Sequence, residues 1–296
     1  MDEKLRKYLY VVRAGSFTVA ARQLRVSQPA LTMAVRDLER ELGVELLVRR
    51  GRSFDVSPAG RLVFDYALAQ SQDWSGLQAQ LADISGDGAP LSIGMIDSLA
   101  ELAFADDDVR SQLLQSVQNR IVVDNSRRLM DMVSQGAIDG AVVVAQTDYP
   151  VAISHEQLGS ESMSIVVAPA LLDGRHSRGR LPYISYDQTS STARWIDGAL
   201  EHTGLIGDSV FYSTSPQIML ELCRRAAGMT VLPDRMVAPA VARNELAYHP
   251  LNQELAIRRP VVSVRRHGAY QAQSVKTVLE QMSALLSVMA SRRDLR

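Results

Sequence analysis

Helical periodicity is strongest between residues 15 and 43, where it surrounds a proline. Four apolar residues recur at i, i+4, i+7 and i+11: Leu31, Val35, Leu38 and Leu42. This spacing predicts one buried stripe of an amphipathic helix, which Gly43 ends. Ser27 is a good N-cap, and proline is tolerated in the first helical turn because the backbone N–H groups there lack intrahelical partners. Pro29 is therefore expected to begin this helix.

A shorter amphipathic helix precedes it. Ser16 is its expected cap, and its inward residues are Phe17, Ala20, Ala21 and Leu24. With residues 25–27 as the turn, the pair is typical of a helix-turn-helix, whose second helix enters the major groove of DNA. Rotation by about 100° per residue places these residues opposite the apolar stripe: Pro29, Thr32, Met33, Arg36 and Arg40. Solvated helices also carry charged outer faces, so this spacing alone leaves both interpretations open.

The next segment predicts a short β-hairpin with a basic tip. Residues 44–48 are rich in apolar side chains, and Phe54-Asp55-Val56 follow a turn at Gly51. The basic residues around that turn are Arg49, Arg50 and Arg52. Beside a helix-turn-helix, such a hairpin is a wing whose arginines contact phosphate or enter the minor groove. The alternative is a charged surface turn, which three arginines in four positions disfavour.

The net charge of −1 hides an asymmetry along the chain. Residues 1–60 carry 11 Lys and Arg against 7 Asp and Glu, or +4, so the remainder, with 21 against 26, carries −5. A basic head on an acidic body indicates a polyanionic partner for the head alone. The length of 296 residues favours about two domains.

Other sequence features exclude several classes of protein. The charged start MDEKLRKY shows no signal peptide, and no run of 18 apolar residues is present, so we expect a cytoplasmic protein without a membrane partner. A single cysteine excludes an intramolecular disulfide and a cysteine zinc cluster. No phosphate-loop, dinucleotide, nucleophile-elbow or zinc-protease motif occurs, and the five histidines lack metal spacing. We therefore expect no catalysis, no cofactor and no metal.

Cys223 leaves a rival interpretation open. It follows Leu222 and precedes Arg224 and Arg225 on a predicted amphipathic helix. Neighbouring arginines can lower the pKa of a thiol, which would suit a redox sensor. A buried structural thiol is the favoured interpretation. The rival function is a small-molecule-binding or redox-sensing protein without sequence-specific reading of DNA.

Residues 4–64 resemble the DNA-binding head of LysR-type transcriptional regulators. The matching segments are GSFTVAA at 15–21, SQPAL at 27–31, DLERELG at 37–43, LLVRRGR at 46–52 and SPAG at 57–60. Three positions depart from the family pattern by chemically close changes: Thr32 for serine, Leu47 for phenylalanine and Ser57 for threonine. Family members that sense peroxide through a disulfide use two cysteines, whereas this chain has one.

The resemblance implies which residues contact double-stranded promoter or operator DNA. The residues that would face the groove are Ser27, Gln28, Pro29, Thr32, Met33 and Arg36. Gln28 would suit adenine, and Arg36 guanine or phosphate. The residues that would hold phosphate are Ser16, Thr18, Arg49, Arg50 and Arg52.

Residues 58–85 predict a long helix that pairs with a partner. Two complementary sets fall seven apart: Val63, Gln70, Leu77 and Ile84, and Ala67, Trp74 and Leu81. This is an a/d seam over about three heptads, although packing on its own domain is the alternative. The family resemblance also implies a linker helix that pairs two subunits, as a homodimer or a homotetramer. Residues 86–90 would then form a hinge.

From Leu91 onward, short β-rich runs alternate with helical stretches. The candidate strands are 91–96, 120–124, 140–145, 162–168, 183–187, 210–214, 229–233 and 259–265. This alternation favours an α/β fold with largely parallel sheets. RLMDMVSQGAIDGAVV and RRAAGMTVLP are similar to LysR-type segments, whereas residues 97–119 and 169–180 depart from them. The resemblance implies a two-lobed, periplasmic-binding-protein-like effector domain.

The predicted organisation has three parts. Residues 1–57 form a winged helix-turn-helix, 58–86 a linker helix and 87–296 the effector domain. Lobe one covers about 90–161 and 259–296, and lobe two covers about 162–258. The implied function is a DNA-binding transcriptional regulator controlled by a small-molecule effector, with RNA polymerase as a further partner if it activates.

Polar residues at the ends of predicted strands mark the expected effector site, because ligands of open α/β sheets bind there near helix N-termini. The candidates are Asp97, Ser98, Leu99, Asn125, Ser126, Val144, Gln146, Ser190, Ser191, Thr214, Ser215 and Thr230, and Thr189 belongs to the same junction as Ser190 and Ser191. Each could instead be only a helix cap. A carboxylate among hydroxyls suggests that Asp97 favours an effector with a cationic group or many hydroxyls.

Overall fold

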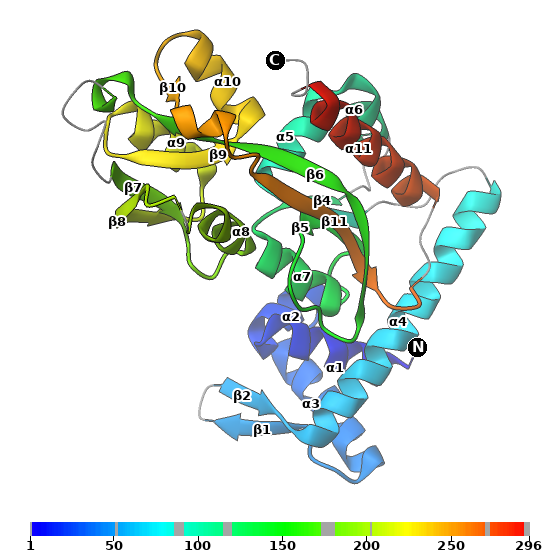
Figure 1. Ribbon diagram of the computed structural model, residues 1–296. Coiled ribbons are helices and arrows are strands. Elements are labelled where there is room, and N and C mark those ends of the chain that lie inside the picture. The colour runs from blue at the N-terminus through cyan, green and yellow to red at the C-terminus, as the bar shows by residue number, and fades with distance from the viewer. Residues whose placement is uncertain are drawn as a thin grey trace. The chain divides into compact units, whose positions relative to one another are not determined.

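The computed structural model describes residues 2–50, 53–85, 92–114, 120–172, 181–201, 203–269 and 273–292 (Figure 1). The chain divides into two compact units. One comprises Met1–Ala89 with Gly268–Gln273, and the other comprises Pro90–His267 with Ser274–Arg296. The predicted hinge at 86–90 and most of the region at 169–180 lie outside the described residues.

The first unit is a winged helix-turn-helix with one long helix. Its elements are α1 (Glu3–Ala14), α2 (Phe17–Leu24), α3 (Gln28–Leu42), β1 (Leu47–Arg50), β2 (Ser53–Val56) and α4 (Pro58–Ser85). The predicted caps are confirmed: Ser16 accepts from the N–H of Val19, and Ser27 from that of Ala30. Pro29 lies in the first turn of α3, as the sequence predicts.

The predicted apolar stripe of α3 is confirmed except at its end. Leu31, Ala34, Val35 and Leu38 are buried in the core of the unit. Leu42, however, is 45% exposed. It is the last residue of α3, and Gly43 turns the chain away in the left-handed conformation, so none of the described elements covers it.

The predicted hairpin is confirmed, and one side chain fixes where it begins. β1 and β2 pair antiparallel, with Leu47 opposite Val56 and Arg50 opposite Ser53. The Glu39 carboxylate of α3 accepts from the N–H groups of Leu46 (2.9 Å) and Leu47 (3.1 Å). A charged acceptor strengthens such bonds, so α3 and the hairpin are joined at a defined position.

The long helix α4 is partly covered by its own unit. At its beginning the buried hydroxyl of Tyr8 donates to the carbonyl of Gly60 (2.9 Å), and Val63 and Ala67 pack in the core. At these two positions of the predicted seam, α4 therefore packs on its own unit, which was the alternative to a partner helix. Further along α4 the apolar side chains are exposed: Trp74 (57%), Leu77 (45%), Leu81 (56%) and Ile84 (82%).

The second unit contains two α/β lobes joined by two long strands. The strands are β3 (Ser92–Met95), β4 (Arg120–Val123), β5 (Gly140–Val144), β6 (Ile153–Val167), β7 (Leu181–Tyr186), β8 (Ile206–Ser213), β9 (Met229–Pro233), β10 (Ala247–Tyr248) and β11 (Arg258–Arg266). The hydrogen-bonded order is β4-β3-β5-β11-β6-β9-β7-β8, with β10 beside β6. In Figure 1, β6 and β11 run between the two lobes.

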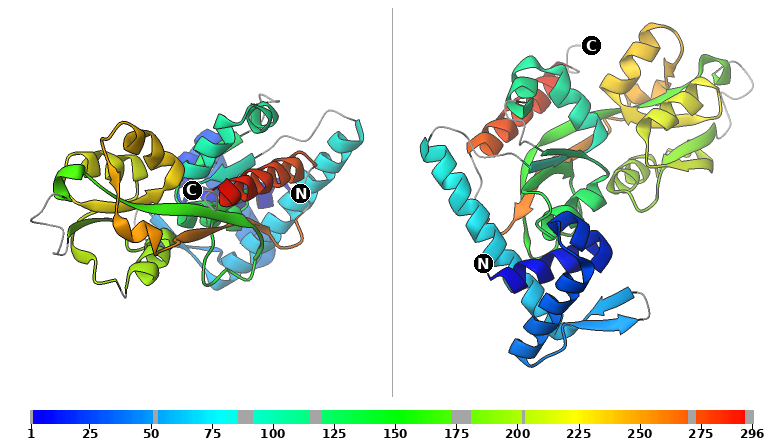
Figure 2. Two further views of the ribbon diagram at one scale, coloured as in Figure 1. Left: turned by 45° about the horizontal axis from the view of Figure 1, so that its top comes forward. Right: turned by 180° about the vertical axis from the view of Figure 1, so that it is seen from behind.

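Helices pack against both lobes. Lobe one carries α5 (Asp97–Ala105), α6 (Asp107–Leu114), α7 (Ser126–Ser134) and α11 (Gln273–Arg292). Lobe two carries α8 (Ser191–Leu200), α9 (Pro216–Arg224), α10 (Asp234–Ala242) and the short helices η1 (Pro169–Leu171) and η2 (Pro250–Gln253). The red helix α11 lies beside α5 and α6 (Figure 2), and its Ser283 donates to the carbonyl of Leu158 in β6 (2.8 Å).

Two sequence predictions about the sheet are corrected. The sheet is mixed rather than largely parallel, because β11 pairs antiparallel with β5 and β6, and β6 pairs antiparallel with β9 and β10. β6 also begins at Ile153, whereas only 162–168 was predicted. Its first ten residues, ISHEQLGSES, are mostly polar and mostly not buried, so they lack the apolar run that marks a strand.

Among the helices that the structure describes, none has the length and apolar character needed to cross a membrane.

Candidate functional site

The outer face of α3 presents most of the residues predicted to face DNA. Gln28, Pro29, Met33 and Arg36 are exposed, with Met33 at 66%. Thr32 is only half-buried rather than fully exposed. Arg40, on the same face, forms an ion pair with Asp37 (2.9 Å). A surface with one large apolar side chain among polar and cationic ones suits the base edges of a groove.

Three other predicted contacts lie at the start of the two helices. Ser16 and Ser27 cap α2 and α3 through their hydroxyl groups. Thr18 donates to the side-chain oxygen of Gln28 (3.5 Å), which joins α2 to α3. Capping does not remove these residues from a phosphate site, because helix N-termini present N–H groups to anions.

The basic wing is described only in part. Arg49 and Arg50 end β1, opposite Phe54 and Ser53 of β2. The backbone of this hairpin is therefore placed, whereas Arg52 and the side chains of Arg49 and Arg50 lie outside the described part of the chain.

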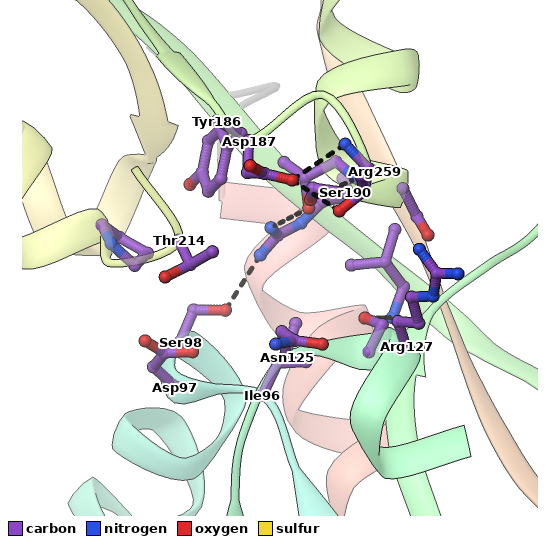
Figure 3. Close-up of a pocket in the computed structure, with 16 residues that line it drawn as sticks. Ile96, Asp97, Ser98, Asn125, Arg127, Tyr186, Asp187, Ser190, Thr214 and Arg259 are labelled. Atoms are coloured by element: carbon purple, nitrogen blue, oxygen red, sulfur yellow. Dashed lines mark hydrogen bonds between the residues drawn. The ribbon is translucent and has the colours of Figure 1, made fainter. Parts of the chain in front are cut away.

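A pocket of about 130 Å³ lies between the lobes of the second unit (Figure 3). Figure 3 shows Asp97, Ser98 and Asn125 on one side and Tyr186, Asp187 and Thr214 on the other. Eight of the predicted effector residues line it: Asp97, Ser98, Asn125, Ser126, Val144, Ser190, Ser191 and Thr214. Segments far apart in the sequence therefore meet at one small polar cavity.

Four predicted residues do not line this pocket. Leu99 faces the core from the inner side of α5 and is completely buried. Thr230 is buried within β9 and donates to the carbonyl of Ile184 (2.9 Å). Ser215 is the N-cap residue that precedes α9, and its N–H donates to the Ser213 hydroxyl (3.0 Å).

The fourth, Gln146, joins the lobes instead. Its side-chain oxygen accepts from the Ser191 hydroxyl (2.5 Å) and from Arg194 (3.3 Å), both on α8. Trp195 of α8 also donates to the carbonyl of Ala145 (3.2 Å). This loop therefore contacts lobe two directly, and Gln146 acts beside the pocket rather than in it.

Sequence reasoning missed the central charge of the pocket. Arg259 of β11 is opposite Glu161 of β6, and the two form a buried ion pair with exposures of 3% and 7%. Arg259 also donates to the hydroxyls of Ser98 in lobe one and Thr192 in lobe two, both at 2.9 Å. Neither strand position carries a motif. The only signal was an arginine at the start of the predicted strand 259–265.

Two buried polar atoms at this place lack partners among the described residues. They are the hydroxyl of Tyr186 and the Nε of Arg259, and both residues line the pocket. Burial raises the pKa of Tyr186, and the neighbouring Arg259 guanidinium offsets only part of that effect. The hydroxyl is therefore neutral. A buried polar group left without a hydrogen bond costs about 1–3 kcal/mol, which a bound ligand can relieve.

Four further lining residues were not predicted: Ile96, Arg127, Asp187 and Pro216. The carboxylate of Asp187 accepts from both the N–H (2.9 Å) and the hydroxyl (2.5 Å) of Thr189. These bonds fix the turn that leads into α8. Thr189 lines the pocket together with Ser190 and Ser191, as the predicted junction at residues 189–191 implies.

The surroundings of Cys223 are those of an unreactive thiol. It is completely buried in the core of lobe two and donates to the carbonyl of Val166 (3.4 Å). Burial raises the pKa of Cys223 to about 12, so the reactive thiolate is scarce at neutral pH. This position argues against the redox interpretation.

Models of known protein families match both units of the chain. The family model "Bacterial regulatory helix-turn-helix protein, lysR family" matches residues 3–61, and "LysR substrate binding domain" matches residues 111–287. YusT of Bacillus subtilis (strain 168), described as an uncharacterized HTH-type transcriptional regulator, is 23% identical over 98% of both chains.

Solved structures share the fold. Full-length OxyR from Pseudomonas aeruginosa, as a cysteine variant, is 18% identical with a TM-score of 0.67 and covers 96% of this chain and 95% of its own. Full-length LysG from Corynebacterium glutamicum with bound effector Arg is 20% identical with a TM-score of 0.62 and covers 96% and 98%. The chain belongs to the LysR family of bacterial transcriptional regulators.

Proposed function

We propose that this regulator reads operator DNA with α3 and the β1–β2 wing, and that a small-molecule effector in the interlobe pocket controls it. The observation that carries the first part is the two-sided character of α3. Its inner face is buried, while Gln28, Pro29, Met33 and Arg36 remain exposed beside a basic hairpin. Arg36 would supply a base or phosphate contact, and Gln28 a contact to adenine.

The second part rests on the pocket. Eight predicted residues, joined by Arg259 and Tyr186, surround a cavity that is too small for a drug-sized molecule, because such ligands need about 300–1,000 Å³. A ligand there would contact both lobes at once. Preference for one lobe arrangement would then shift the population of DNA-binding states.

The exposed apolar residues of α4 favour a homodimer, with a homotetramer as the larger assembly. Two-fold proteins read two half-sites on DNA. The regulator would work in the cytoplasm beside its operator, with no catalytic step, and would contact RNA polymerase if it activates transcription.

The test of DNA reading compares Arg36→Ala with Arg225→Ala. Arg225 is a matched control, because it is an exposed arginine at the C-cap of α9 that pairs with Glu221. Fluorescence anisotropy with DNA flanking the gene should show about 5- to 150-fold weaker binding for Arg36→Ala, which corresponds to about 1–3 kcal/mol. Arg225→Ala should bind like the unaltered protein. Equal affinities for both variants would contradict the role of α3.

A further inference from the structure

Four helices of the second unit begin at the pocket. α5 and α7 belong to lobe one, and α8 and α9 belong to lobe two. The first-turn residues Asp97, Ser126, Ser191 and Pro216 all line the cavity. Each helix N-terminus carries partial positive charge and N–H groups that point away from the helix. Together they favour a negatively charged group between the lobes.

Two of these N-termini are open. Asn125 caps α7 by accepting from the N–H of Arg128 (3.0 Å), and Ser190 caps α8 by accepting from that of Thr192 (3.1 Å). α5 and α9, by contrast, begin without a side-chain cap. One open N-terminus therefore comes from each lobe.

The unpartnered buried atoms independently indicate a ligand at the same place. Tyr186 is 4% exposed and Arg259 is 3% exposed, and the Tyr186 hydroxyl and Arg259 Nε have no hydrogen-bond partner among the described residues. Both atoms can donate, and both belong to residues that line the pocket. Arg259 is also joined to Ser98, which begins α5 beside Asp97 (Figure 3). An anionic group would find donors from both lobes here.

A carboxylate lies beside these donors. Asp97 lines the pocket, is half-buried, and is close enough to Arg259 and Tyr186 to affect their ionisation. It forms no ion pair with any residue that the structure describes. Asp187, the other lining carboxylate, already accepts two bonds from Thr189. Asp97 is therefore the acceptor available to a cation.

We infer that the pocket binds a small zwitterion whose carboxylate meets Tyr186, Arg259 and the open helix ends, and whose amino group meets Asp97. A purely anionic ligand would be repelled by Asp97, and a purely cationic one would leave the donors unmatched. The cavity of about 130 Å³ limits the ligand to a few heavy atoms, as in a small α-amino acid. This inference rests on the proposed effector function of the pocket.

The test uses the full-length protein and isothermal titration calorimetry. The probes are the common α-amino acids, each with its N-acetyl derivative and its decarboxylated amine, and succinate and putrescine as ligands of one charge type. At least one small amino acid should bind, with its N-acetyl derivative and its amine each at least tenfold weaker. Succinate and putrescine should bind more weakly than that amino acid.

Variants then locate the binding. Asp97→Asn should weaken the amino acid at least tenfold, and Tyr186→Phe should weaken it severalfold. The matched control is Asp131→Asn, which removes the same charge from an exposed position on α7. Asp131→Asn should bind normally, and circular dichroism should show that all three variants fold.

Three results would overturn the inference. The first is that no amino acid binds to the protein. The second is that succinate or putrescine binds as tightly as the best amino acid, and the third is that the Asp97→Asn variant binds that amino acid with unaltered affinity. DNA binding by the same preparations is measured separately, without ligand. Retained DNA binding together with any of these results would reject the ligand class but leave the regulator intact. Loss of DNA binding by the unaltered protein would reject the proposed function instead.

Discussion

Arg259 is a single residue that connects the two lobes of the second unit. Its guanidinium pairs with Glu161 on the neighbouring strand and donates to hydroxyls from both lobes. A buried charge is tolerated only when it is paired and hydrogen-bonded. Burial alone would lower the pKa of Arg259, but the neighbouring Glu161 carboxylate, with a smaller effect from Asp97, keeps that pKa raised, so the cation is maintained.

Removal of this cation should destabilise the second unit. Arg259→Met leaves the Glu161 carboxylate buried without its partner, which should cost about 3–5 kcal/mol. The measurement is urea unfolding of the full chain, followed by Trp195 fluorescence in a Trp74→Phe background. A Glu161→Leu, Arg259→Met double variant should lose less than Arg259→Met alone. A loss of less than about 1 kcal/mol in the free energy of unfolding for the single change would show that this ion pair contributes no more than a surface ion pair.

Cys223 gives a second prediction at the residue scale. Its folded pKa, raised to about 12 by burial, exceeds that of an unfolded thiol. The folded state therefore holds the proton more tightly, so the contribution to stability is complete below the unfolded pKa. It is lost as pH rises through the interval up to about 12.

The measurable consequence is a difference between proteins. The free energy of unfolding of the unaltered chain should fall more steeply between about pH 9 and pH 11 than that of Cys223→Ala, which has no thiol to titrate. The native thiol should also resist a colorimetric disulfide reagent at pH 8 until the protein unfolds. Parallel pH profiles and rapid labelling would contradict a buried thiol.

At the scale of elements, α4 combines two packing environments in one helix. Its beginning is fixed by the Tyr8–Gly60 hydrogen bond and the head core. Trp74, Leu77, Leu81 and Ile84 continue the heptad spacing into solvent. An exposed a/d stripe indicates a partner helix.

Leu81→Asp should therefore weaken the dimer, because a carboxylate in an a/d seam loses apolar burial and cannot be solvated there. Sedimentation equilibrium should show a rise in the dimer dissociation constant of at least tenfold. Leu62→Asp is the matched control: it changes another exposed leucine of α4, 73% exposed and outside the predicted seam. Equal effects from both changes would argue that another surface holds the subunits together.

The elements also show what sequence could and could not predict. α2 and α3 were predictable because their apolar spacing and their caps at Ser16 and Ser27 are short-range signals. Residues 153–162 of β6 were not, because these mostly polar residues form a strand by pairing with β11, far away in the sequence. The prediction of a largely parallel sheet was wrong for the same reason, because the direction of pairing depends on strands that are far apart in the sequence.

The pocket also contains residues that the sequence could predict and residues that it could not. Asp97, Asn125, Ser190 and Thr214 could be predicted because ligands gather where strands end and helices begin. Arg259 and Glu161 could not, because their pairing depends on the register of two antiparallel strands. Gln146 was predicted for the pocket but contacts α8 instead, and only side-chain geometry distinguishes these roles.

At the scale of the whole molecule, the chain separates a DNA-binding unit from an effector-binding unit. Positive charge is concentrated in residues 1–60, which carry +4, whereas the remainder, which includes most of α4, carries −5. The two family models match one unit each. The central claim is that the first unit recognises specific DNA through α3 and the wing.

The measurement that tests this claim most directly is an anisotropy titration of the full-length protein at several salt concentrations between about 50 and 200 mM. It compares DNA flanking the gene with a scrambled duplex of the same composition. We predict binding to the first duplex that is at least about a thousandfold tighter, with affinity that falls steeply as salt rises. Equal affinity for both duplexes, or no binding by the folded protein, would contradict the account.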